Sequence, residues 1–287
     1  SVTIDGAANT GTVNKGANGT DTLVNVELPL LAGNINGGLQ IVGTGGNDSF
    51  VVAPDTDQWM ALRPGAGVDS FTINGTGFVR LDFRNGNGID VNLATGQIAN
   101  DGFGNAEVIG GTNSVWEVTG SGGNDRMIGS DANESFRYGG GTNNTVEGGG
   151  GTDRLRYDRN QIEEGVSVDL AAGTASGSWR GAAFSHSFSS IEQVRGSRTG
   201  DDTLLGSSGN DSLDGGAGTD IGGQSTDADQ VATSTSLVGH GTDILAGIEG
   251  IRLTGGAGDN SIDATSFTGN STLSGVDGDD TLTGGAG

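Results

Sequence analysis

A short phrase recurs along the chain and limits what the chain can fold into. It reads Gly-x-Asp-x-U, where U is an apolar residue, so each copy supplies a turn glycine, a carboxylate and one core residue. The nine copies place their aspartates at Asp21, Asp48, Asp69, Asp125, Asp153, Asp202, Asp211, Asp243 and Asp280. Because so short a unit cannot bury a core alone, the phrase predicts a stack of repeats.

The spacing of the phrase predicts the form of this stack. Asp202, Asp211 and Asp220 follow one another at intervals of nine, and Asp48 and Asp69 are 21 apart, about two units. Two short strands and two glycine turns would make one coil, with the apolar residue pointing inward. Helices are disfavoured because each interior glycine costs about 1 kcal/mol relative to alanine. We therefore predict an all-β fold, a parallel β-roll or β-helix solenoid. Its expected interior ladder is Phe50, Phe71, Met127, Leu155, Leu204, Leu213 and Leu282.

Composition excludes several classes of protein. The chain has 58 Gly but only 3 Pro, without the regular glycine period of collagen, and no Cys, so neither disulfides nor thiolate metal sites are present. A formal net charge of −23 argues against nucleic acid as a partner and favours a bound cation. No apolar run is long enough for a membrane-spanning helix, so we expect no membrane insertion.

The carboxylates of stacked coils predict calcium sites. Stacking places the same turn of successive coils close together, so Asp202 should lie above Asp220 and Asp125 above Asn144. Such carboxylates repel each other unless a cation neutralises them, and calcium suits a site of irregular carboxylate and carbonyl oxygens. The further expected pairs are Asp48 with Asp69, Asp69 with Asp90, Glu134 with Asp153, and Asn260 with Asp280. All candidate ligands for several calcium ions are Asp48, Asp69, Asp90, Asp125, Glu134, Asn144, Asp153, Asp202, Asp211, Asp220, Asp243, Asn260 and Asp280.

Three stretches resemble a known repeat family. They are GGGGTDRLR at 148–156, GSSGNDSLD at 206–214 and GGAGTDIGG at 215–223, the last with Gly222 in place of the apolar residue. They are similar to the RTX, or haemolysin-type, calcium-binding nonapeptide. The resemblance implies a parallel β-roll with calcium between successive turns, and export by a type I secretion system.

The remaining sequence suggests longer coils inserted in one solenoid. GIDVNLATG at 88–96 and GVSVDLAAG at 165–173 share five of nine residues, and apolar-Glu pairs such as Ile191-Glu192 follow the longer coils. The chain has no initial Met and ends just before another expected aspartate, which predicts a piece of a longer protein. The expected segments are degenerate coils at 1–120, RTX-like coils at 121–160, a longer coil with a loop at 161–200, RTX coils at 201–222, and a loop with further RTX-like coils at 223–287.

These features predict a non-enzymatic, calcium-dependent structural module of a secreted or cell-surface bacterial protein, such as an adhesin, a surface-layer protein or an exoprotein. No HExxH, GxSxG or P-loop pattern occurs. The alternative is a carbohydrate-active or carbohydrate-binding β-helix, with Trp179 or the basic stretch Arg154–Arg159 contacting a glycan and calcium only supporting the site. Self-association of the repeat array is also left open.

Overall fold

A computed structural model of the chain describes residues 2–5, 10–14, 20–24, 39–54, 56, 59–159, 162 and 164–287. Its contacts divide it into two compact units, Ser1–Gly151 and Thr152–Gly287. In the residues that the structure describes, both units are built from short strands, together with one 3-10 turn, η3 (Thr112–Ser114). Within the described ranges, no helix has the length and apolar character needed to cross a membrane.

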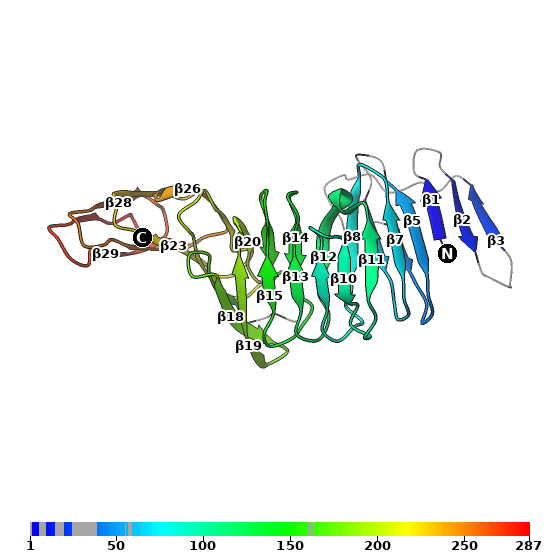
Figure 1. The fold of residues 1–287 in the computed structure, drawn as a ribbon. Coiled ribbons are helices and arrows are strands. Elements are labelled where there is room, and N and C mark those ends of the chain that lie inside the picture. The colour runs from blue at the N-terminus through cyan, green and yellow to red at the C-terminus, as the bar shows by residue number, and fades with distance from the viewer. Residues whose placement is uncertain are drawn as a thin grey trace. The chain divides into compact units, whose positions relative to one another are not determined.

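The first unit contains a mainly parallel sheet, which we term its long sheet. Its strands, in order across the sheet, are β3 (Thr20–Val24), β2 (Thr10–Asn14), β1 (Val2–Asp5), β5 (Ser49–Ala53), β7 (Ser70–Ile73), β11 (Glu107–Gly110), β10 (Gln97–Asn100), β9 (Asp90–Asn92), β13 (Arg126–Ile128) and β15 (Thr145–Glu147). Only β2 and β10 run antiparallel to both neighbours. Strands that are far apart in sequence therefore lie side by side (Figure 1).

The second sheet of the first unit is wholly parallel. It consists of β4 (Leu39–Val42), β6 (Trp59–Arg63), β8 (Phe78–Asp82), β12 (Val115–Thr119) and β14 (Ser135–Arg137). A single bulge interrupts the register between Val115 and Glu117, where β12 meets β8. Successive coils thus contribute one strand to each sheet, as the spacing of the repeat predicts.

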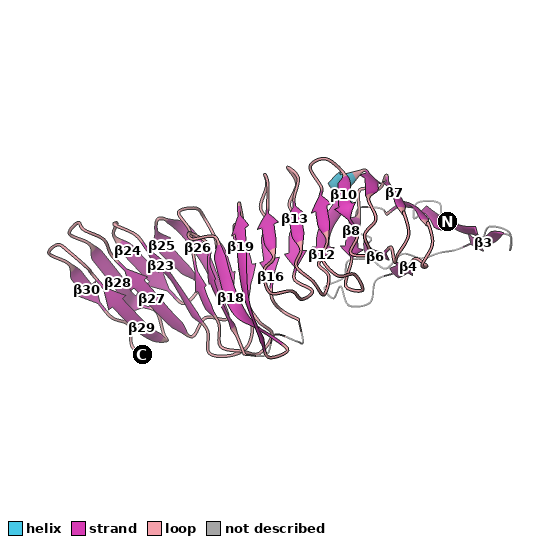
Figure 2. Ribbon diagram, turned by 60° about the horizontal axis from the view of Figure 1, so that its bottom comes forward, coloured by secondary structure: helices cyan, strands magenta, loops and turns pink. Residues whose placement is uncertain are grey.

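The second unit repeats this arrangement. Its first sheet consists of β19 (Ala182–Ser189), β18 (Thr174–Trp179), β17 (Val166–Asp169), β21 (Thr203–Leu205), β23 (Ile221–Ser225), β27 (Gly250–Thr254) and β29 (Asn270–Ser274). Its second sheet consists of β16 (Arg154–Arg156), β20 (Gln193–Arg195), β22 (Ser212–Asp214), β26 (Gly241–Ala246), β25 (Ser236–Gly239), β24 (Gln230–Thr233), β28 (Ser261–Ser266) and β30 (Thr281–Thr283). The pairs β18–β19, β17–β18, β24–β25 and β25–β26 are antiparallel and the other pairs are parallel (Figure 2).

The fold is therefore all-β and is a parallel solenoid, as predicted. The inserted longer coils are the antiparallel strands: β10 in the first unit, and β18–β19 and β25 in the second. The division of the chain by repeat type at residues 120, 160, 200 and 222 stays a prediction.

The core of each unit is a narrow ladder of in-register apolar residues. Phe50 lies beside Phe71 on neighbouring strands, and their rings stack with centroids 5.2 Å apart. Met127, Leu155 and Leu204 are each 0% exposed, as the repeat predicts. Leu282 differs, with 44% of its surface exposed, because β30 pairs only with β28 among the described strands.

One repeat copy lacks its apolar residue, and its neighbours fill the space. A Cβ at Gly222 would lie 3.2 Å from a methyl group of Ile248 and 3.5 Å from one of Leu245, which belongs to the facing sheet. The larger side chains of adjacent positions thus replace the missing apolar group. The inner faces of the two sheets meet across this thin core.

Candidate metal sites in the turns

The aspartates of the repeat form columns of hydrogen bonds between successive coils. In the first unit, the backbone amide of Asp48 donates to Oδ1 of Asp69 at 2.7 Å. The amide of Asp69 donates in turn to Oε1 of Glu107 at 3.0 Å. Each carboxylate therefore accepts from the equivalent residue of the preceding coil. We call such a series a carboxylate column.

A second column in the same sheet begins at an apolar residue. The amide of Ile89 donates to Oδ1 of Asp125 at 3.1 Å, and the amide of Asp125 donates to Oδ1 of Asn144 at 2.7 Å. Two longer coils share the sequence motif at 88–96 and 165–173, and in both of them an apolar residue takes the column position. Val166 is the counterpart of Ile89 in the second unit, where its amide donates to Oδ1 of Asp202 at 2.7 Å.

The second unit continues this pattern on both of its sheets. On the first sheet, the amide of Asp202 donates to Oδ1 of Asp220 at 2.7 Å, and the amide of Asp220 donates to Oε2 of Glu249 at 2.9 Å. The column is thus three successive acidic residues. Backbone amides on the second sheet make equivalent bonds from Asp153 to Glu192 at 2.8 Å, from Asp211 to Asp243 at 2.9 Å, and from Asn260 to Asp280 at 2.8 Å.

The same side chains close their own turns. Oδ2 of Asp125 accepts from the amide of Ser121 at 2.9 Å, and Oδ2 of Asp202 accepts from the amide of Ser197 at 2.7 Å. The glycine that begins the turn leaves room for this carboxylate. A Cβ at Gly196 would lie 2.1 Å from Oδ2 of Asp202, closer than real Cβ contacts. The glycine six residues before the aspartate is therefore required by this carboxylate.

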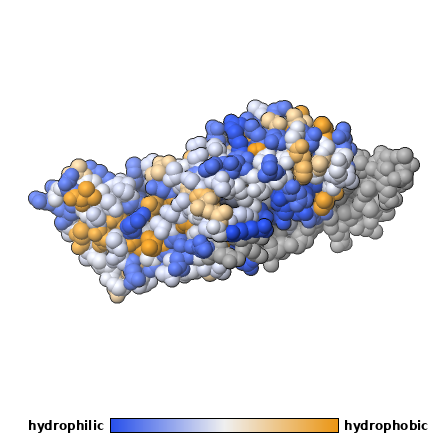
Figure 3. All heavy atoms as spheres, turned by 90° about the horizontal axis from the view of Figure 1, so that it is seen from below, coloured by the Kyte–Doolittle hydropathy of each residue, from blue (hydrophilic) through white to orange (hydrophobic). Residues whose placement is uncertain are grey.

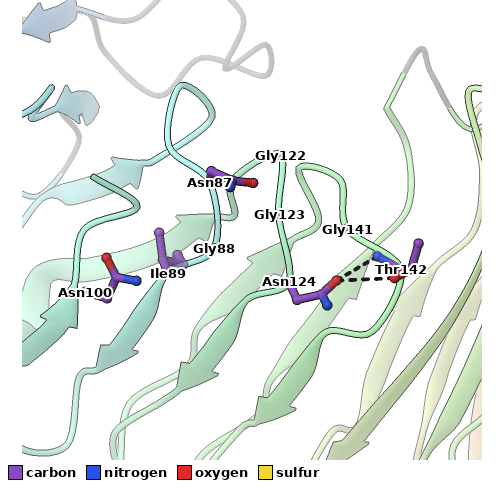
Figure 4. Close-up of a pocket in the computed structure, with 9 residues that line it drawn as sticks. All are labelled: Asn87, Gly88, Ile89, Asn100, Gly122, Gly123, Asn124, Gly141 and Thr142. Atoms are coloured by element: carbon purple, nitrogen blue, oxygen red, sulfur yellow. Dashed lines mark hydrogen bonds between the residues drawn. The ribbon is translucent and has the colours of Figure 1, made fainter. Parts of the chain in front are cut away.

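The residue before each aspartate forms a second ladder of opposite direction. Oδ1 of Asn124 accepts from the amide of Thr142 at 2.9 Å, in the following coil (Figure 4). Oδ1 of Asp201 accepts from the amide of Thr219 at 2.8 Å in the same way. Beside Asn124, these turns border an open pocket of about 580 Å³ whose side chains include Asn87 and Asn100. Both residues of an Asn-Asp or Asp-Asp pair thus hold neighbouring coils in register.

Burial changes the acidity of the column carboxylates. It raises the pKa of Asp69, Asp125, Asp202 and Asp243 to about 6, and that of Glu107 to about 8, mainly because the charged form loses water. The hydrogen bonds from backbone amides lower these values only in part. In the folded chain, the columns therefore carry negative charge that is poorly compensated near neutral pH.

The column oxygens fit a hard cation. Oδ2 of Asp69, Asp220 and Asp243 and Oε2 of Glu107 are buried and accept no hydrogen bond from any described residue. The carbonyl oxygen of Gly200 points at the next turn, 2.5 Å from where a Cβ of Gly218 would lie. Calcium binds such mixed carboxylate and carbonyl oxygens. In the described part of the chain, no three Asp, Glu or His side chains gather as a metal-binding group. A calcium ion would therefore need carbonyl oxygens or water as further ligands.

One of the expected pairs is not that of the structure. Asp69 stacks on Glu107 rather than on Asp90, because Ile89 occupies the column position of that coil. Asp90 lies one residue later, on the outer face, where its Oδ1 is 3.0 Å from Nη1 of Arg126. Glu134 belongs to the first unit, and its Oε2 accepts from the amide of Ser130 at 3.2 Å. Its expected pairing with Asp153 stays a prediction.

Three glutamates hold column positions that the sequence prediction did not include. Glu107, Glu192 and Glu249 accept from the amides of Asp69, Asp153 and Asp220. The sequence carried a signal for them, because each is followed two residues later by a buried apolar residue, as the aspartates are. The apolar-Glu pairs marked the longer coils correctly, but their Glu was not assigned a role.

Asp21 of the repeat lies outside the residues whose side chains are described.

Together, the stacked turns and buried carboxylates define a parallel β-solenoid with acidic, glycine-rich turns. A family model described as the RTX calcium-binding nonapeptide repeat matches the chain in four copies, over residues 117–137, 138–159, 198–221 and 265–287. The chain thus carries stretches similar to RTX calcium-binding repeats, and these stretches cover about a third of its length. No curated protein matches the chain. The matched ranges contain the columns from Asp125 to Asn144 and from Asp202 to Asp220, whereas Asp48 and Asp69 lie outside them.

Proposed function

We propose that the chain is a calcium-dependent structural module of a secreted or cell-surface bacterial protein. The observation that carries the proposal is the column of Asp202, Asp220 and Glu249, in which successive acidic residues stack through backbone amides. The first two carboxylates are almost fully buried, and burial raises the pKa of both. Bound calcium would supply the positive charge that such a stack lacks at neutral pH.

The same electrostatics would make folding depend on calcium concentration. In the absence of the cation, repulsion among buried carboxylates, added to a net charge of −23, favours the expanded chain. At ten times its Kd, each calcium site adds about 1.4 kcal/mol to the free energy of unfolding. Several sites together match the usual stability of a domain. The chain would stay unfolded at cytosolic calcium, pass through a type I secretion channel, and fold outside the cell.

The proposed role is that of a wall or spacer in an adhesin, a surface-layer protein or an exoprotein, and not that of an enzyme. The bonding of the carboxylates supports this proposal. Asp125 accepts from the amides of Ser121 and Ile89, and Asp202 accepts from those of Ser197 and Val166. Carboxylates engaged in this way hold coils together rather than face a substrate.

Size-exclusion chromatography with in-line light scattering tests this proposal on the full chain. At submicromolar calcium, we expect an expanded chain with a radius of gyration of roughly 60 Å, and at millimolar calcium a much smaller one. Magnesium at equal ionic strength is the control and should leave the chain expanded. A chain that is equally compact at both calcium concentrations would contradict folding after secretion.

A further inference from the structure

The outer face of the second sheet in the second unit carries a row of side chains in register. The row runs from Arg154 on β16 through Gln193 on β20 and Ser212 on β22 to Ile244 on β26. Neighbouring strands lie about 4.8 Å apart, so the row presents one side chain at each such interval. It therefore forms a straight track across the strands rather than a pocket.

Arg154, at one end of the track, differs from the other arginines of this sheet. Its Nε and Nη2 both donate to Oε1 of Gln193, at 2.9 and 2.5 Å. Among the described residues, no carboxylate lies within salt-bridge distance of its guanidinium group. The amide of Gln193 thus fixes the orientation of an exposed cation without neutralising it, and the other N–H donors of Arg154 remain directed away from Gln193.

Two more arginines reinforce the positive potential beside Arg154. Arg156 and Arg195 are in-register neighbours on β16 and β20. Arg156 is 2.6 Å from Oδ2 of Asp158, and Arg195 is 3.5 Å from Oδ2 of Asp214. Three guanidinium groups therefore face two carboxylates, so this end of the track has an excess of positive charge in a strongly acidic chain.

The opposite end of the track is apolar and exposed. Ile244 is 62% exposed and pairs with Ser236 on β25. Two positions along from Ser236, Val238 pairs with Val231 on β24, with 43% and 46% of their surfaces exposed. Apolar and hydrophilic residues lie side by side on the surface of this unit (Figure 3). The face thus offers a cation, then neutral hydrogen-bonding groups, then apolar contacts.

The geometry points to this track, from Arg154 to Ile244, as a binding surface for an acidic polysaccharide. The guanidinium group of Arg154 would bind a carboxylate or sulfate of the polymer, a pairing that arginine makes with two parallel hydrogen bonds. Gln193 and Ser212 would bind sugar hydroxyls, and Ile244 would contact the apolar face of a sugar ring. Each track residue directly follows a column residue of this sheet, Asp153, Glu192, Asp211 or Asp243, but its side chain lies on the outer face.

The charge and chemistry of the track favour a polysaccharide over a nucleic acid. A nucleic acid carries a phosphate at every nucleotide, which a chain of net charge −23 repels, and its bases need aromatic stacking platforms. The track has no aromatic side chain among the residues that define it. Trp179, a candidate for sugar stacking, lies elsewhere, in the β18–β19 hairpin, with the guanidinium groups of Arg159 and Arg180 over its ring at 5.5 and 6.0 Å. A polymer with sparse acid groups matches the small excess of positive charge.

Binding of hyaluronan tests the proposal, because this polymer has one carboxylate per disaccharide. Its Kd would be measured by biolayer interferometry with the full chain in millimolar calcium, after circular dichroism has shown that every variant is folded. We expect binding by the unaltered chain, and a Kd about tenfold weaker in Arg154→Gln, because a charge-assisted hydrogen bond is lost. Neutral dextran should bind to neither.

Arg252→Gln is the matched control. Arg252 is exposed on β27, in the other sheet of the same unit, and its removal changes the net charge equally. Equal weakening by the two variants would show general charge attraction and overturn the proposal, as would the absence of hyaluronan binding. Free glucuronate and inorganic sulfate are the final arms. If either competes as effectively as the polymer per acid group, Arg154 is a simple anion site and the extended track is refuted.

Discussion

The backbone amide of Asp202 donates a hydrogen bond to Oδ1 of Asp220 at 2.7 Å, across 18 residues of sequence. The amide of Asp220 makes the same bond to Glu249. Each acidic residue therefore acts twice, as acceptor for the coil before it and as donor to the coil after it. This relationship sets the register of the coils, and it also stacks negative charge in a buried place.

The first prediction concerns the glycine that begins each turn. In Gly196→Ala, the added Cβ would lie 2.1 Å from Oδ2 of Asp202. We expect the free energy of unfolding in calcium to fall by about 1 to 3 kcal/mol, measured by urea denaturation. Gly209→Ala is the control, since its Cβ would meet nothing closer than Oγ of Ser207 at 3.5 Å. Equal effects of the two substitutions would refute the close fit.

The second prediction is that Asp220→Asn stabilises the calcium-free fold but reduces the stabilisation that calcium provides. Asp220→Asn keeps an acceptor for the amide of Asp202 but removes a buried negative charge next to Glu249. At pH 8 in chelator, with trimethylamine N-oxide added so that the calcium-free chain folds, Tm should therefore rise by the equivalent of about 1 kcal/mol, whereas the increase in Tm caused by calcium should shrink. Asp277→Asn, at an exposed position, should change neither value. A lower Tm of the variant in chelator would show that the negative charge of Asp220 does not destabilise the calcium-free fold.

The third prediction is the pH dependence without calcium. Burial raises the pKa of Asp125, Asp202 and Asp243 to about 6 and that of Glu107 to about 8. These groups bind protons more tightly in the folded chain than in the unfolded chain, where their pKa is about 4. The stability that they contribute is therefore complete below about pH 4 and is lost as the pH rises through 6 to 8.

Thermal unfolding in a chelator that works across this range is the measurement. Tm should fall from about pH 5 until the calcium-free chain no longer folds near neutral pH, and millimolar calcium should reduce the fall because the cation replaces the proton. A Tm that rises with pH in chelator would mean that salt-bridged carboxylates such as Asp82, whose pKa is lowered by Arg84 and Arg63 against the effect of burial, dominate instead.

The fourth prediction concerns the glutamates of the columns. Glu249→Ala leaves the amide of Asp220 without its side-chain acceptor. The free energy of unfolding should fall by about 1 kcal/mol in chemical denaturation. Glu249→Gln keeps an oxygen acceptor and should be close to the unaltered chain. Glu164→Ala, at an exposed position, is the control and should leave the free energy of unfolding unchanged. If Glu164→Ala lowered it as much as Glu249→Ala, the stabilising role of the column would be refuted.

The repeat was sufficient to predict the fold because its period and its apolar position act together. The offset of two residues between Asp202 and Leu204 placed one residue in the turn and the other in the core, and both positions are observed. The inserted strands β10 and β25 could not be located from the same rule, because they follow tertiary pairing rather than the nonapeptide period.

The pairing of carboxylates was only partly predictable, because the inserted coils shift which residue occupies the column position. Asp90 lies 21 residues after Asp69, as the period requires, yet it falls on the outer face because Ile89 takes the column position. Glu107, 38 residues after Asp69, completes that column instead. Where a longer coil is inserted, residues that are one repeat interval apart in sequence no longer stack on each other. The sequence interval alone therefore predicted the wrong partner for Asp69.

Far-UV circular dichroism of the metal-stripped chain during a calcium titration tests the central claim most directly. We predict a cooperative gain of β-sheet signal at millimolar calcium, and no gain with magnesium at equal ionic strength, since the turns offer many irregular oxygens rather than an octahedral site. A full β-sheet signal in chelator at neutral pH, unchanged by calcium, would contradict the claim. The carboxylate columns would then hold the coils together without any cation.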